Sequence, residues 1–225
     1  MYSEVTHLED AAARIPCMGA KKIGTILRQA AAEVPAGSCI VEVGAWLGAG
    51  TAQLAMGAMA SPSGPEVHVF DRFTASASEV GKAAAADITL VEGQDTRPVV
   101  GKHLSAFDAS VHLHRGDIRD IEWTHGSIGL YVDDASKEMK EFSHVLKTFG
   151  PSWVPGQTIL IMMDFGYWRK FAHDPAAEKR LRAQYDFITA HPDCFEMVDE
   201  RPVKGSSAAI IRYTKAFDFN ASIAS

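Results

Sequence analysis

Apolar and polar residues follow a helical and then a strand-like pattern in the first part of the chain. In residues 23–34 the apolar side chains recur three and four positions apart, which predicts an amphipathic helix that ends at Pro35. The next residues, 39–43, form a short and mostly apolar run that predicts a buried strand. A stretch rich in alanine and methionine over 51–60 predicts a second helix. The chain therefore opens with a helix–strand–helix unit.

The same alternation continues to the end of the chain. Short apolar runs predict strands at 67–71, 111–114, 128–132 and 158–163. Apolar residues three and four positions apart predict helices at 139–149 and 176–189. The chain closes with strands near 195–198 and 208–213, which a Gly205–Ser207 turn joins into an antiparallel hairpin. Strands that alternate with helices form a parallel sheet with helices on both faces. We therefore expect an α/β fold with a doubly wound, mostly parallel sheet and an antiparallel C-terminal hairpin.

Composition narrows the class of protein. The chain has 225 residues, of which 47% are hydrophobic and 22% charged, close to average globular usage. These fractions exclude an intrinsically disordered chain and a disulfide scaffold. The 22 lysines and arginines against 28 aspartates and glutamates give a net charge of −6, with no basic run. Nucleic acid is therefore not an expected partner.

Cysteine usage and the length of the apolar runs predict the compartment. The three cysteines, Cys17, Cys39 and Cys194, lie far apart and form no C-x-x-C, which is typical of a reducing compartment. The longest purely apolar run, 159–163, is far too short to span a membrane, and the first residues have no signal-peptide pattern. We expect a soluble, cytoplasmic protein without a membrane partner.

A glycine-rich loop follows the first predicted strand and opens a helix, which is the context of a nucleotide-binding turn. Its glycines, Gly44, Gly48 and Gly50, have the order G-x-x-x-G-x-G, whereas a dinucleotide site has G-x-G-x-x-G and a P-loop has a lysine. Glu42 lies two residues ahead of the first glycine and suits a ligand that carries an ammonium group and no phosphate. The alternative is a tight strand-to-helix turn without a ligand.

Acidic residues follow the next two predicted strands. Ligands of doubly wound sheets bind at the carboxyl ends of the strands, so these side chains are expected at one site. Asp71 ends the second strand, 21 residues after Gly50, where a carboxylate can accept hydrogen bonds from both hydroxyls of a ribose. Asp117 follows the third strand. The alternative for Asp71 is a helix N-cap.

The glycine loop and these acids resemble motif I and the cofactor-binding acids of the class I S-adenosylmethionine (SAM) methyltransferases. The resemblance covers residues 37–214 and implies a Rossmann-like methyltransferase fold, a seven-stranded sheet with an antiparallel last strand, and SAM as the cofactor. In that family an acid at the position of Asp117 accepts from the adenine amine, and the next side chain, Ile118, packs on the ring. The implied cofactor-binding residues are Glu42, Gly44, Ala45, Trp46, Gly48, Gly50, Thr51, Asp71, Arg72, Asp117, Ile118 and Asp133.

The residues after the fourth and fifth strands resemble small-molecule O-methyltransferases related to the macrocin O-methyltransferase group. That resemblance implies Asp133 and Asp164 as ligands of a magnesium ion, and Asp133 also beside the methionine part of SAM. Lys137 stands where some relatives have a histidine base, and Phe165 departs from the catechol-type pattern. A lysine acts as a base only where its pKa is lowered toward neutral. The alternatives are helix capping or orientation of neighbours for the two acids, and an exposed side chain for Lys137.

These observations predict a division of the chain and a function. We expect an N-terminal helical extension or cap over residues 1–36, a SAM-binding domain over 37–215 and a C-terminal tail over 216–225. The expected activity is methyl transfer from SAM to a hydroxyl oxygen of a small molecule, with Lys137 and Asp133 as catalytic residues. An NAD-dependent oxidoreductase and a non-catalytic SAM-binding protein are the alternatives, and a homodimer stays open. His112 and His114 lie on one side of a strand, as a metal-chelating pair or as ordinary sheet residues.

Overall fold

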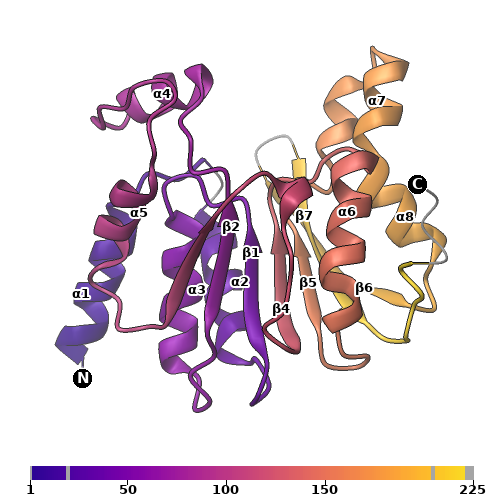
Figure 1. Cartoon of the computed structure of the whole chain (residues 1–225), viewed down its shortest axis with the longest axis horizontal. Coiled ribbons are helices and arrows are strands. Elements are labelled where there is room, and N and C mark those ends of the chain that lie inside the picture. The colour runs from indigo at the N-terminus through magenta and orange to yellow at the C-terminus, as the bar shows by residue number, and fades with distance from the viewer. Residues whose placement is uncertain (1, 19–20, 204–205, 221–225) are drawn as a thin grey trace.

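A computed structural model describes residues 2–18, 21–203 and 206–220 of the chain. In this part of the chain seven strands form one sheet in the order β3-β2-β1-β4-β5-β7-β6 (Figure 1). The strands are β1 (Cys39–Val43), β2 (Val67–Asp71), β3 (Val111–Arg115), β4 (Ile128–Asp133), β5 (Ile159–Met162), β6 (Phe195–Val203) and β7 (Ser206–Tyr213). The first five pair in parallel, β7 runs antiparallel to β5, and β6 antiparallel to β7. The predicted fold class is confirmed.

Helices cover both faces of the sheet, as expected of a doubly wound fold (Figure 1). They are α1 (Tyr2–Ala13), α2 (Lys21–Ala32), α3 (Ala49–Ala60), α4 (Ala77–Ala84), α5 (Arg97–Leu104), α6 (Met139–Phe149), α7 (Pro175–Leu181) and α8 (Ala183–Ala190). One core cluster joins α2 and α3 to the sheet through Leu27, Leu54 and Ile40. A second cluster on the other face holds aromatic residues of α6 and α8, among them Phe142 and Phe187.

The central strand β4 shows why the strands of this sheet are continuous apolar stretches in the sequence. Every residue of β4 is buried, because β1 and β5 flank it and helices cover it on both faces. Leu130 and Val132 belong to the first core cluster, whereas Ile128 and Tyr131 belong to the second. A strand that is buried on both faces shows no alternation of apolar and polar residues.

Both predicted terminal segments contribute to these cores. Ile15 of the N-terminal segment lies in the same core cluster as Ile40 of β1. Phe219, after the sheet, is 3% exposed and packs in the second cluster beside Trp153. The sheet and the described parts of its two flanking segments therefore share one pair of cores.

Two segments differ from the expected elements. Between the strands predicted at 67–71 and 111–114, where the apolar pattern predicted no helix, the chain forms α4, which begins with a capping box between Ser76 and Glu79. The helix expected over 176–189 is two helices, α7 and α8, that meet at Arg182. No proline or glycine marks this break in the sequence. At the break, the guanidinium of Arg182 lies over the ring of Trp168, 4.6 Å from its centre. The predicted turn at Gly205 lies outside the described residues, and Ser206 and Ser207 already belong to β7.

Among the described residues, no helix combines the length and the apolar character that crossing a membrane requires.

Candidate functional site

A cavity of about 700 Å³ opens beside the carboxyl ends of β1, β2 and β4, where the strand order reverses. Sites for small ligands have volumes of ~300–1,000 Å³ and occur at this place in doubly wound sheets. Nine predicted cofactor residues line the cavity, namely Glu42, Gly44, Ala45, Trp46, Gly50, Asp71, Arg72, Asp117 and Ile118. The other three, Gly48, Thr51 and Asp133, are not among the described residues that line it. The fold therefore brings most of the predicted set together.

The glycine loop reaches the cavity through a backbone that turns sharply between β1 and α3. Gly44 and Gly48 both have a φ of 89°, in the left-handed region that favours glycine. A Cβ atom on Gly44 would lie 3.1 Å from the carbonyl carbon of Asp134, so the bare backbone also lets the loop after β4 come close. Trp46 adopts a φ of 48° without being glycine. The loop thus brings the ends of β1 and β4 to one point.

Asp71 fastens this loop to the end of β2. Its Oδ2 accepts hydrogen bonds from the backbone amides of Ala45, at 2.8 Å, and Trp46, at 3.2 Å. Its Oδ1 accepts from the amide of Phe73 at 2.7 Å. The loop amides therefore point to a carboxylate of the protein, and a phosphate group would meet a negative charge instead of free donors. Oδ2 is fully occupied by these two amides, whereas Oδ1 keeps a second lone pair for a ligand hydroxyl.

Glu42 lies at the floor of the cavity, 3% exposed. Its Oε2 accepts a hydrogen bond from the Thr51 hydroxyl at 2.5 Å. A Cβ on Gly50 would lie 2.5 Å from Oε1 of Glu42, so glycine at this position leaves room for the carboxyl group. Burial, opposed by the Thr51 hydrogen bond and assisted by the negative charges of Asp134 and Asp71, raises the pKa of Glu42 to about 8. Glu42 is therefore mostly protonated at neutral pH, and a cation beside it would favour the ionised form.

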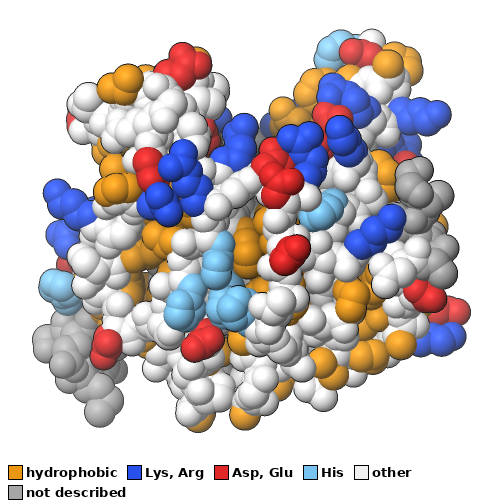
Figure 2. Space-filling view, viewed as in Figure 1, with side chains coloured by type: hydrophobic (Ala, Val, Ile, Leu, Met, Phe, Trp, Pro, Cys, Tyr) orange, Lys and Arg blue, Asp and Glu red, His pale blue; other side chains and the backbone are white. Residues whose placement is uncertain are grey.

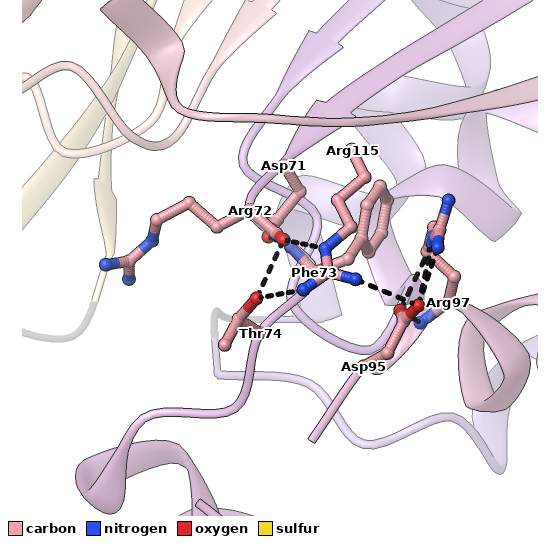
Figure 3. Close-up of polar contacts among 7 residues, drawn as sticks. All are labelled: Asp71, Arg72, Phe73, Thr74, Asp95, Arg97 and Arg115. Carbon is pink, nitrogen blue, oxygen red and sulfur yellow. Dashed lines mark hydrogen bonds and ion pairs between the residues drawn. The ribbon is translucent and has the colours of Figure 1, made fainter. Parts of the chain in front are cut away.

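Arg72 and its neighbours form a polar cluster beside the cavity (Figure 3). Arg115 donates to the backbone oxygen of Arg72 at 3.3 Å, to the Thr74 hydroxyl at 3.2 Å and to Asp95 at 3.2 Å. Hydrogen bonds and charge from Arg97, together with Arg115, lower the pKa of Asp95 to about 2. The side chain of Arg72 points away from this cluster in Figure 3. The cluster therefore holds the backbone of the segment after β2 and leaves the Arg72 guanidinium out.

Asp117 and Ile118 follow β3 at the rim of the cavity. The Asp117 carboxylate accepts from the backbone amide of Arg119 at 3.0 Å and pairs with its guanidinium at 2.6 Å. These contacts hold the pKa of Asp117 well below its usual range. Ile118 is partly buried against the second core cluster. An anionic acceptor and an apolar side chain thus stand side by side at this rim.

Asp133 has a different setting from the one expected of an exposed metal ligand. It is 1% exposed, and its Oδ1 accepts from the amides of Ala135, at 3.0 Å, and Ser136, at 2.9 Å. Its Oδ2 accepts from the Tyr131 hydroxyl at 3.2 Å and from the Ser136 hydroxyl. Four donors of the protein therefore occupy this carboxylate. The geometry agrees with the alternative reading of Asp133 as an orienting residue, here of the loop after β4.

Asp134, the next residue, lines the cavity and was not singled out from the sequence. Asp134 is exposed, and solvent reaches its side chain through the cavity. Partial desolvation of the carboxyl group by the surrounding protein, together with the charge of Asp164 and against that of Lys137, raises the pKa of Asp134 to about 7. Its signal in the sequence was a second acid directly after Asp133. Strand alternation cannot tell which of two adjacent acids faces the ligand once the strand has ended.

Lys137 also lines the cavity, and its Nζ lies 2.5 Å from Oδ2 of Asp164. Burial disfavours its charged form, but the hydrogen bond and charge of Asp164 and the charge of Asp134 outweigh burial, so the pKa of Lys137 is raised. The lysine therefore stays protonated at neutral pH. The neighbours of Lys137 are carboxylates rather than the cations that would lower its pKa.

The pair of acids expected to bind magnesium does not fit that ion. Magnesium requires octahedral oxygen ligands with open lone pairs. The Asp133 oxygens are taken by four protein donors, and the Lys137 ammonium lies where a cation beside Asp164 would lie. Asp164 is also absent from the described lining of the cavity. The lysine supplies the positive charge at this position of the site.

The remaining walls come from the N-terminal segment and from α6. Cys17, Met18 and Ile23 line one side of the cavity. Two other lining residues each have a buried polar atom without a hydrogen-bond partner among the described residues. These atoms are Oε2 of Glu141 and Nε1 of Trp46. Buried polar atoms are usually paired, so both atoms offer positions for polar groups of a ligand.

The charge of the cavity favours a cationic ligand. Seven acidic residues line its described part, against three basic ones. SAM carries a sulfonium and an ammonium group and no phosphate, whereas NAD carries a pyrophosphate. SAM therefore fits the acidic lining of the cavity. It also fits the close approach that Gly44 allows and the unpartnered Nε1 of Trp46. The same residues fit a dinucleotide poorly because Asp71 already occupies the loop amides.

Among known proteins, the chain is similar in fold to solved structures but matches no family model or curated sequence. A Corynebacterium glutamicum protein aligns with 96% of this chain and 91% of its own at 13% identity and a TM-score of 0.61. The methyltransferase PaMTH1 of Podospora anserina, solved with S-adenosylhomocysteine (SAH), aligns with 94% of this chain and 88% of its own at 15% identity and a TM-score of 0.58. The O-methyltransferase NovP aligns with 86% of this chain and 80% of its own, at 15% identity and a TM-score of 0.58.

The chain has a Rossmann-like methyltransferase fold. At these identities the similarity concerns the path of the backbone. The chemistry therefore has to be argued from the side chains of the cavity.

Proposed function

We propose that the chain is a SAM-dependent methyltransferase that transfers the methyl group to a hydroxyl oxygen of a small molecule. The observation that carries the proposal is the contact between Asp71 and the glycine loop. By accepting from the amides of Ala45 and Trp46, Asp71 makes the loop a poor phosphate site and a good site for ribose hydroxyls beside a cationic group. Methyltransferase neighbours with the same fold support this choice.

The described residues divide the work of binding. Glu42 lies at the floor as the acid nearest to an ammonium group, and its ionisation would accompany binding because its pKa is about 8 without a cation. Asp117 and Ile118 at the rim suit the exocyclic amine and the face of a purine. Cys17 and Met18 line the cavity on the side of α2. SAM, when bound, supplies an activated methyl group on a sulfonium leaving group.

The chemical step needs an acceptor oxygen in line with that methyl group and a place for its proton. We assign the proton to Asp134, because its carboxyl group faces the cavity and its pKa is about 7. With SAM bound, methyl transfer to the acceptor oxygen would release SAH, and the hydroxyl proton would pass to the Asp134 carboxylate. The Lys137 ammonium lies in the same cavity, where it orients the acceptor oxygen and stabilises Asp134 in its ionised form. Asp133 acts through the loop that carries Asp134 and Lys137.

The volume and lining of the cavity favour a small acceptor. A space of about 700 Å³ holds SAM and leaves room for an acceptor of modest size. Its charge is unsuited to a polyanion, because acids outnumber bases more than two to one.

Two measurements test the proposal. Calorimetric titration with SAH and with NAD should give saturable binding for SAH alone, and SAH at 100-fold its Kd should stabilise the fold by ~2.7 kcal/mol. Incubation with SAM labelled in the methyl group and a panel of phenols, sugars and flavonoid-like compounds should then give a labelled ether. Binding of NAD without SAH would favour an oxidoreductase. Binding of SAH without a product across the panel would favour the non-catalytic alternative.

A further inference from the structure

Four histidines gather on one face of the sheet, away from the cavity. His68 is the second residue of β2, His112 and His114 lie on β3, and His125 lies in the segment that leads to β4. Figure 2 shows histidine side chains clustered on this face of the molecule. The parallel register of β2 and β3 pairs His68 with His112, and residues two apart on a strand share a face. None of the four is among the described residues that line the cavity.

From this geometry we infer a binding site for one divalent transition-metal ion, such as zinc, with His68, His114 and His125 as the ligands. A ring nitrogen of each lies within 4.8 Å of one on each of the other two. Nδ1 of His68 and Nε2 of His114 share a hydrogen bond at 3.1 Å, and a bound ion would take the place of the proton between them. Two nitrogens on one tetrahedral zinc, each about 2.0–2.1 Å from the ion, lie about 3.3 Å apart. The two rings therefore already have nearly the separation that shared coordination requires.

The second nitrogen of His68 has the partner that zinc-bound histidines usually have. Its Nε2 lies 3.3 Å from Oε2 of Glu66, so a proton on this nitrogen points to a carboxylate and leaves Nδ1 with its lone pair toward His114. Carboxylates in this role orient metal-bound imidazoles and raise their basicity. His68 is 2% exposed, which holds its ring in place.

The third ligand stands on a segment that is already held in place. The Sγ of Cys39 donates to the backbone oxygen of His125 at 3.6 Å, and Nε1 of Trp123 donates to that of Gly126 at 2.8 Å. His125 itself is exposed, so an ion can enter from solvent. Cys39, Glu66 and His68 also approach one another. The three-histidine set is the better site, because the facing nitrogens of His68 and His114 already have nearly the separation that shared coordination requires.

A metal at this place would act on the fold rather than on the methyl group. It would tie β2 and β3 to the segment 116–127, whose first three residues, Gly116, Asp117 and Ile118, line the cavity. The fourth position of the ion, open to solvent, would hold water. The inference is independent of the proposed function, because none of its ligands lines the cofactor cavity.

Zinc titration of the full chain, free of any affinity tag and treated with a chelator, tests the inference. We expect calorimetry to give one zinc ion per chain and the melting temperature to rise with zinc. Cobalt should give the intense visible bands of a tetrahedral site. No saturable zinc binding, or cobalt bands typical of octahedral coordination, would overturn the inference.

Four variants identify the ligands. His125→Ala should weaken zinc binding by more than the ~10–100-fold that loss of an outer partner costs, and Glu66→Gln should fall within that range. His173→Ala, another exposed histidine, is the matched control and should bind zinc as the unmodified chain does. Equal binding by the His125→Ala and His173→Ala chains would overturn the assignment. So would a loss with Cys39→Ser as large as with His125→Ala.

Discussion

The two walls of the cavity are held in place by different kinds of interaction. At the ends of β1 and β2, Asp71 accepts from three backbone amides, and Glu42 is buried against Thr51. At the ends of β4 and β5, charged side chains face one another, with Lys137 paired to Asp164 and Asp134 beside them. The first wall is held by hydrogen bonds from loop amides and from Thr51, whereas in the second wall the charges of Asp164, Lys137 and Asp134 shift one another's pKa values. The first wall therefore suits cofactor binding and the second suits proton transfer.

The largest effect is expected from Asp134→Asn on the second wall. Loss of a general base lowers kcat by ~10²–10⁴-fold, while SAH affinity should change little because the first wall is intact. In the unmodified chain kcat should rise with pH as Asp134 ionises, with a midpoint at or below its pKa of about 7, because a cationic cofactor favours the carboxylate. Initial rates with the best acceptor of the panel, measured from pH 5 to 9, check both expectations. An Asn variant with unchanged kcat would remove Asp134 from the mechanism.

Asp71→Ala breaks the first wall instead. Charge-assisted hydrogen bonds contribute ~1.5–3 kcal/mol each, so losing its contacts should weaken SAH binding by about 100-fold or more. Because Asp71 also holds three amides of the protein, we expect a lower free energy of unfolding as well. Calorimetry with SAH and urea unfolding measure the two effects.

Asp95→Ala is the matched control for Asp71→Ala. Asp95 belongs to the neighbouring polar cluster and pairs with Arg97 and Arg115, outside the described lining of the cofactor cavity (Figure 3). Its loss should leave SAH affinity within a few-fold of the unmodified chain. Equal weakening by both variants would mean that the cavity responds to the segment as a whole and not to the Asp71 carboxylate.

Glu42→Gln tests the buried charge of the first wall through the pH dependence of stability. The pKa of Glu42 is about 8 in the folded chain, against a usual value of 4.5. Below pH 4.5 both states carry the proton; between 4.5 and 8 the unfolded state loses it first, so the free energy of unfolding falls as pH rises. At about 1.36 kcal/mol per pKa unit, the loss amounts to a few kcal/mol. Urea unfolding at pH 5 and pH 8 should show a smaller decrease for the Gln variant.

Glu33→Gln is the control for this measurement, because Glu33 is exposed. The free energy of unfolding of the Glu33→Gln chain should fall between pH 5 and pH 8 by as much as that of the unmodified chain. If the Glu42→Gln chain and the Glu33→Gln chain behave alike, the carboxyl group of Glu42 is not the source of the pH dependence.

Lys137→Met should have the smallest effect on stability. The side chains of Lys137 and Asp164 are 36% and 29% exposed, and solvent-exposed ion pairs contribute ~0–1 kcal/mol. Because Lys137 lowers the pKa of Asp134, its removal should move the pH midpoint of kcat upward. A Met variant whose pH profile loses its acid limb altogether would return the role of base to Lys137.

The sequence predicted the fold and the first wall well. Apolar runs and helical periodicity depend on burial, which follows from local pattern once the fold is α/β. The seven strands and the cavity-lining residues Gly44, Asp71 and Asp117 were predicted because strand ends converge at one edge. The capping box at Ser76 was readable but overlooked, whereas the break at Arg182 leaves no local signal.

The second wall and the histidine cluster depended on the tertiary structure. Asp133 and Asp134 are adjacent in the sequence, and only the turn after β4 directs one into the protein and the other into the cavity. The protonation of Lys137 follows from Asp164, which comes from another strand.

The sequence by itself determined the order of strands and helices, the glycine turn and the acids at its side, because these depend on neighbours along the chain. His112 and His114 were visible as a pair, but the sheet adds His68 from β2 and His125 from a later segment. Charge and coordination depend on distances between residues far apart in the sequence. Only the packed chain sets those distances, and with them which acids ionise and which imidazoles can share an ion.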